Sequence, residues 1–105
     1  MGLTQYKIDF GSMPWASPTK GIRQKVFRAH DVQLRLVEYS RTMPQRCGEK
    51  SHVGYVLDGK MEIKFENETQ EYSAGDGVYL PSGSKHKHMA KMLTDTVTAV
   101  FVEKV

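Results

Sequence analysis

The feature that most constrains this sequence is the alternation of apolar and polar side chains at every second position. Residues 32–39, 53–57 and 60–66 alternate in this way, and residues 94–103 are rich in β-branched side chains. Successive side chains of a β-strand point to opposite faces, so this pattern predicts half-buried strands. No window of ten residues has a convincing helical period, so we expect no long helix.

Turn-forming residues separate the alternating segments. The pair Asp58-Gly59 lies between two of them, which predicts a β-hairpin. Residues 67–69, 74–77 and 81–84 provide further turns. Many short strands with closely spaced turns predict an all-β antiparallel sandwich or barrel, and a barrel interior is where a small ligand would bind.

The chain of 105 residues is long enough for one domain. Residues 12–21 are dense in turn formers and place two prolines close to Trp15. We therefore expect residues 1–21 to form an N-terminal arm that packs on the barrel and is held there by Trp15. Residues 22–105 then form a single barrel domain.

Composition narrows the choice of partners. Apolar residues make up 39% of the chain and charged residues 26%, a balance that excludes a disordered tail and a membrane protein. The net charge of +3 comes from interspersed acidic and basic residues, which argues against a nucleic-acid binder. The densest basic stretch, residues 85–88, is either a solvated strand edge or an anion-attracting rim of a pocket.

Cys47 is the single cysteine of the chain, so no intramolecular disulfide can form. The N-terminal residues lack the charged and apolar regions of a secretion signal. Together with the composition, these features predict a cytoplasmic protein without membrane or nucleic-acid partners.

A specific motif occupies residues 75–86. Its spacing is G-x5-P-x-G-x2-H, with Gly75, Pro81, Gly83 and His86 at the fixed positions. In physical terms, a glycine turn precedes a short strand, and a Pro-x-Gly turn then places a histidine just inside the next strand. This run resembles the second sequence motif of the cupin family.

The first cupin motif resembles G-x5-H-x-H-x3,4-E-x6-G, and it is altered in this chain. When Gly59 is taken as the last glycine, His52 occupies the glutamate position. Gln45 and Cys47 then occupy the two histidine positions, and the shorter spacing supplies no histidine either. The run Cys47-x4-His52 looks like that of a subset of small single-domain cupins. The resemblance extends over about residues 32–103.

The resemblance implies a cupin-type double-stranded β-helix, also called a jelly-roll barrel, and often a homodimer. It also implies a central pocket. Familiar cupins hold Fe, Mn, Ni or Zn there on three histidines and a glutamate. In this chain only His86 stands at a standard ligand position, so a metal site has to be argued from residue chemistry.

His86 and His88 are two positions apart on a predicted strand, so we expect them to share a face. With His52 and Cys47 they form a candidate metal-ligand set. Imidazoles and a thiolate suit Zn²⁺ or Ni²⁺ better than Fe²⁺ or Mn²⁺. Each side chain also has a plainer interpretation, the histidines as hydrogen-bonded pocket residues and Cys47 as a small buried hydrophobe. A pocket without a metal is therefore the alternative.

We expect four further residues to contact a ligand or line the pocket: Gln45, Tyr55, Met61 and Lys85. Two functional hypotheses follow. The first is a metal-dependent enzyme of the isomerase or lyase type acting on a small polar molecule. The second is a non-catalytic module that binds or senses a small ligand without a metal. A purely structural role has no specific support in the sequence.

Overall fold

The computed structural model describes residues 6–44 and 51–104 of the chain. Its only helical segments there are two short 3-10 turns, and no helix in these ranges is long and apolar enough to cross a membrane. The elements are η1 (Phe10–Ser12), β1 (Ala16–Thr19), β2 (Ile22–Ala29), β3 (Val32–Ser40), β4 (His52–Asp58), β5 (Lys60–Lys64), β6 (Thr69–Ser73), β7 (Gly77–Leu80), η2 (Ser84–His86), β8 (Met89–Met92) and β9 (Thr96–Lys104).

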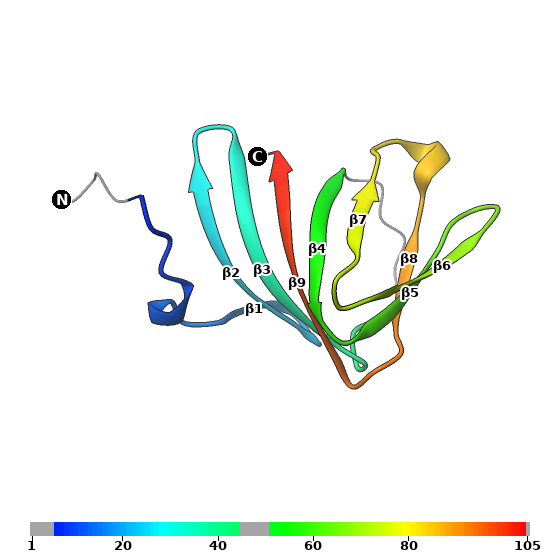
Figure 1. The fold of residues 1–105 in the computed structure, drawn as a ribbon, viewed down its shortest axis with the longest axis horizontal. Helices are drawn as coiled ribbons and strands as arrows, with labels where there is room; N and C mark the ends of the chain where they lie inside the picture. The colour runs from blue at the N-terminus through cyan, green and yellow to red at the C-terminus, as the bar shows by residue number, and fades with distance from the viewer. Residues whose placement is uncertain (1–5, 45–50, 105) are drawn as a thin grey trace.

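The strands form two antiparallel sheets. The larger sheet has the order β1-β2-β3-β9-β4-β7, and the smaller has the order β6-β5-β8 (Figure 1). The chain crosses between the sheets several times, so strands that are distant in sequence lie side by side. The most consequential case is β9, which lies between β3 and β4 in the larger sheet. This arrangement confirms the predicted all-β jelly-roll fold.

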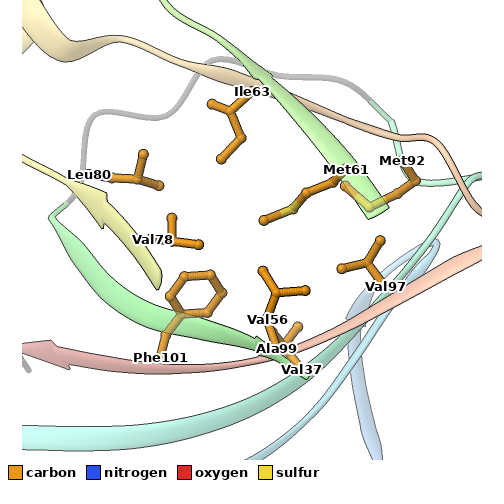
Figure 2. Packing of buried hydrophobic residues seen from close by; sticks show 10 residues of the cluster. All are labelled: Val37, Val56, Met61, Ile63, Val78, Leu80, Met92, Val97, Ala99 and Phe101. Carbon is orange, nitrogen blue, oxygen red and sulfur yellow. The ribbon is translucent and has the colours of Figure 1, made fainter. Parts of the chain in front are cut away.

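The core lies between the two sheets, where apolar side chains from both converge (Figure 2). Strand β9 contributes every second residue from Val97 to Phe101, and β5 contributes Met61 and Ile63, as the alternation predicts. Full burial of such a side chain stabilises a fold by about 1.5–3 kcal/mol. The buried apolar residues are Val37, Val56, Met61, Ile63, Val78, Leu80, Met92, Val97, Ala99 and Phe101.

One turn prediction was wrong. Asp58-Gly59 does not close a hairpin, because β4 pairs with β7 and β9 whereas β5 pairs with β6 and β8. Gly59 has a φ of +90°, which favours glycine, and it turns the chain from one sheet to the other. An Asp-Gly pair supplies a tight turn whether or not the flanking strands pair. The turn after β5 does close a hairpin, with Lys64 opposite Thr69.

The N-terminal arm contacts strand β2. Strand β1 pairs with β2 at the edge of the larger sheet, and Figure 1 shows the preceding residues extending beyond that edge. The Trp15 ring lies 4.5 Å from Cζ of Arg23 and 4.7 Å from Nζ of Lys25. The Lys25 ammonium also donates a 2.7 Å hydrogen bond to the carbonyl of Phe10. These contacts hold the arm to β2, and the domain boundary at residue 22 stays a prediction.

Candidate functional site

A cavity of about 200 Å³ lies between the two sheets. Its walls are mostly apolar, and its polar side chains are one tyrosine and two histidines. Strands from both sheets contribute to it, together with the loop that follows β3. The lining residues are Tyr39, Met43, Pro44, His52, Met61, Ile63, Leu80, His88, Ala90 and Phe101.

His52 reaches the cavity because it begins β4 on the face that buries Val56. Gly54 lies between them on this face and has no side chain. A Cβ atom at Gly54 would collide with the carbonyl oxygen of Val100 and the ring of Phe101. The missing side chain therefore makes room for Phe101, whose ring centroid lies 5.5 Å from that of His52.

Behind His52 lies a cluster of polar side chains around Glu103 at the end of β9. The sheet register brings them together, since Gln33 of β3 lies opposite Glu103, and Val53 of β4 lies opposite Val102. Glu103 Oε2 is 2.6 Å from His52 Nδ1 and 2.8 Å from Arg35 Nη2. Gln33 donates a 2.7 Å hydrogen bond to Glu103 Oε1. The Glu103 and Arg35 side chains are only 9% and 15% exposed.

These contacts keep Glu103 ionised. Burial alone would raise the pKa of Glu103, but contacts from His52, Arg35 and Gln33 and the charge of Arg35 outweigh it. The pKa of Glu103 consequently lies far below its ordinary value of 4.5. The contact with His52 is short, yet Nδ1 makes no well-aligned hydrogen bond to a described residue. The contact is therefore a close polar contact in which the carboxylate lies away from the N–H axis.

His88 is the second anchored imidazole. Its side chain is buried immediately before β8, and its Nδ1 lies 3.0 Å from the carbonyl oxygen of His86. The His88 ring centroid is 6.3 Å from that of His52, and the two rings meet edge to face. The cavity thus has two neighbouring imidazoles, and each has its Nδ1 atom next to an oxygen.

The structure brings together only some of the residues predicted for the site. His52, His88 and Met61 line the cavity. His86 is exposed at the end of η2 and lines a separate groove together with Lys85. The 3-10 turn interrupts the expected strand, so His86 and His88 do not share a face.

The other predicted residues lie elsewhere. Tyr55 is 48% exposed and lies on the face of β4 opposite His52. Gln45 and Cys47 lie outside the described residues. Gly59, Gly75 and Gly83 all have positive φ angles. Pro81 directly follows β7, as expected for a motif that shapes turns.

Sequence reasoning missed Glu103, Arg35 and Gln33. A signal for Glu103 was present, because it continues the alternation of buried residues through Val97 and Phe101. A charged residue in phase with a buried apolar series predicts a partner of opposite charge on a neighbouring strand. Identifying that partner requires the order of the strands.

The described residues do not form a complete metal site. Between residues 6 and 44 and between 51 and 104, no three His, Cys, Asp or Glu side chains are arranged to hold an ion. Zinc sites in proteins use three or four protein ligands, and the cavity supplies two imidazoles. A third ligand would have to come from elsewhere, for example from Cys47.

Comparison with known proteins identifies the family. No curated protein matches this sequence. Among solved structures, KdgF from Halomonas sp. has a TM-score of 0.76 and 22% identity, over 95% of this chain and 94% of that one. The polyketide cyclase RemF from Streptomyces resistomycificus has a TM-score of 0.74 and 18% identity, over 95% and 79%. An RmlC-like cupin from Shewanella frigidimarina has a TM-score of 0.74 and 12% identity, over 95% and 90%.

At these identities, the likenesses concern the fold alone. The sequence itself matches the family model described as a cupin domain over residues 40–102, more than half of the chain. That range includes His52, His88 and the motif at residues 75–86, and the two-sheet fold agrees with it. This chain therefore belongs to the cupin family.

Proposed function

We propose that this cupin binds a small organic molecule in the cavity between its sheets and that His52 transfers a proton to or from it. The observation that carries the proposal is the pair of anchored imidazoles, His52 and His88, in a mostly apolar cavity. Cavities of about 150 Å³ accept benzene, so a cavity of about 200 Å³ suits one six-membered ring with small substituents.

Glu103 supports a role for His52 in proton transfer. A carboxylate next to one ring nitrogen orients an imidazole and stabilises it when the other nitrogen takes up a proton. General acid–base catalysis of this kind serves isomerase and lyase reactions. In the alternative function, the two imidazoles hold the ligand and release it unchanged.

A thermal-shift screen of ring alcohols, keto acids, sugars and amino acids tests the proposal. Ala90 lines the cavity, so Ala90→Leu should fill it and abolish the shift of any true ligand. His86→Gln is the matched control because His86 lines a different groove. Ligands that stabilise Ala90→Leu as much as they stabilise the wild type would overturn the proposal. A screen in which no compound stabilises the wild type would overturn it too.

Proton NMR of each ligand after long incubation separates the two functions. Chemical change that is lost in His52→Gln while binding persists supports an enzyme. A ligand that is unchanged by the wild type supports a binding module.

A divalent ion, Zn²⁺ or Ni²⁺, is a further proposal, and it rests on the nearness of His52 and His88 and on Cys47 as a third ligand. An anchored Nδ1 atom is typical of metal-binding histidines, which makes the arrangement compatible with coordination. Metal analysis of tag-free protein should find one ion, which Cys47→Ser or His88→Gln should remove. If added Zn²⁺ and Ni²⁺ leave the stability of the protein unchanged, the metal proposal is contradicted.

We also propose that the protein forms a homodimer through the outer face of the larger sheet. An apolar row crosses five strands of this face, and four of its members are among the exposed large hydrophobic residues. The central residues Val53 and Val102 are 51% and 50% exposed. The row consists of Phe27, Leu34, Val102, Val53 and Tyr79, each paired with the next across the sheet.

A second copy of the chain fits this face better than a charged partner, because the row carries no charge. The whole outer face of these five strands, over about 20 Å of strand length, has a projected area of roughly 400 Å². The accessible area of such a rough surface exceeds its projection and approaches the roughly 600–800 Å² per partner of a small stable interface. A cytoplasmic location and the lack of nucleic-acid and membrane partners remain predictions from the sequence.

Sedimentation equilibrium tests the dimer. The wild type should be dimeric at about 50 µM, and Val102→Glu should be monomeric because a buried unpaired charge opposes association. Ala16→Glu, on exposed residue Ala16 of edge strand β1, is the control and should stay dimeric. A monomeric wild type would refute this interface.

A further inference from the structure

The contacts of the two Nδ1 atoms determine which ring nitrogens carry hydrogen. His88 Nδ1 lies 3.0 Å from the carbonyl oxygen of His86, and a carbonyl oxygen can only accept a hydrogen bond. Nδ1 of His88 must therefore carry the hydrogen. In a neutral imidazole the other nitrogen, Nε2, is then an acceptor.

The same reasoning applies to His52. Its Nδ1 lies 2.6 Å from a carboxylate oxygen of Glu103, and without a hydrogen on Nδ1 two electron-rich atoms would repel each other at that distance. Nδ1 must carry the hydrogen even though the contact is off-axis. Arg35 already balances the charge of Glu103 through its Nε and Nη2 atoms. The carboxylate therefore needs no second cation, and in a neutral ring of His52 the Nε2 atom is the acceptor.

The two imidazoles of the cavity consequently offer acceptors rather than donors. Among the described residues, none donates a hydrogen bond to Nε2 of His52 or of His88. The third polar group is the hydroxyl of Tyr39. Burial raises the pKa of Tyr39, and the nearby charge of Arg35 opposes this only in part, so the hydroxyl stays protonated. It can donate or accept, and the remaining walls are apolar.

We infer that the cavity selects a neutral six-membered ring that carries one or two hydroxyl groups, which donate to Nε2 of His52 and His88. The inference rests on the proposed function, concerns the cavity without a metal ion and adds the class of ligand. The imidazole centroids are 6.3 Å apart, so one small ring in the cavity can lie next to both imidazoles. An anion is disfavoured, because two lone pairs would face its charge in an apolar cavity.

The test compares ring compounds of matched shape on metal-depleted wild-type protein by isothermal titration calorimetry: catechol and o-xylene, phenol and toluene, and benzoate. A hydroxyl that replaces a methyl group adds one hydrogen bond to an otherwise unpaired acceptor. We expect catechol to bind about tenfold more tightly than o-xylene, and benzoate to bind more weakly than phenol.

His88→Leu removes one acceptor. It should therefore reduce the preference for catechol over o-xylene about threefold, without weakening the binding of o-xylene. His86→Gln is the control, since His86 contributes only its backbone carbonyl to His88. Nitrogen-15 NMR of the imidazoles at pH 7.5 should show both histidines with hydrogen on Nδ1 alone.

Equal binding of catechol and o-xylene, tightest binding of benzoate, or hydrogen on Nε2 of either histidine would overturn the inference. None of these results affects the proposed function, because that depends on the broader screen with Ala90→Leu. If none of the five compounds binds at about 10 mM, the ligand class is wrong, whatever else the screen finds.

Discussion

Replacing Arg35 by methionine should show how strongly the fold depends on the pairing of Glu103. Methionine keeps most of the length of arginine but removes the contacts with Glu103 at 2.8–3.2 Å. Breaking one side of a buried ion pair costs about 3–5 kcal/mol. Since Gln33 and His52 still contact the carboxylate, we expect a loss near the lower end, about 3 kcal/mol.

For a domain of this size, 1 kcal/mol shifts Tm by about 4–8 °C, so Tm should fall by about 12–24 °C. Circular dichroism during thermal and urea unfolding at pH 7 measures both quantities. Lys60→Met is the control, because Lys60 Nζ lies 3.8 Å from Glu71 in a pair about half exposed. Lys60→Met should lower the free energy of unfolding by less than about 0.5 kcal/mol. In Arg35→Met/Glu103→Leu no buried charge is left unpaired, so stability should largely recover.

The same pair determines the acid response. The pKa of Glu103 is below its ordinary value of 4.5 in the folded state, so its contribution to stability is present above that value and is lost as pH falls. Wild-type stability should therefore decrease between about pH 5 and pH 3, and Glu103→Gln should lose this part of the decrease. If the free energy of unfolding of Arg35→Met lies within about 0.5 kcal/mol of the wild-type value, the reasoning is refuted. An unchanged acid slope in Glu103→Gln would refute it too.

Three further predictions concern other parts of the fold. Gly54→Ala should destabilise the protein by about 2 kcal/mol in urea unfolding, because the added Cβ collides with the Phe101 ring; wild-type stability would contradict this account. Met61→Ala should cost about 3 kcal/mol and enlarge the ligand cavity, so calorimetry should detect tighter binding of bulkier rings unless the cavity collapses. Trp15→Ala should release the arm from Lys25, and trypsin should then cleave it faster while the Tm of the barrel changes little; an unchanged cleavage rate would show that Trp15 does not hold the arm.

The sequence was sufficient to predict the fold class, because alternation is a local property of each strand. Residues 97–103 show this most clearly, since every second side chain from Val97 onward is buried. Pairing between strands is not local, and there the prediction failed at Asp58-Gly59. The same two residues form a hairpin or a corner depending on which strands compete for β4, and β7 and β9 occupy both of its edges.

The candidate site was predictable to the same extent. His52 was inferred from its place in an altered motif and His88 from its spacing, and both line the cavity. The same spacing gave a wrong prediction for His86, which does not share a face with His88 because a turn of 3-10 helix precedes the strand. Glu103 is separated from His52 by about half of the chain. Only the insertion of β9 between β3 and β4 makes them neighbours.

The central position of β9 also affects how the protein reaches its native state. Before β9 docks, β3 and β4 each expose an unpaired backbone edge that another chain can join. Pairing β3 with β9 joins residues as distant as Val32 and Lys104, so closure requires a long loop and is expected to be slow. Conditions that delay this closure should therefore favour aggregation of partly folded chains, even when the finished domain is stable.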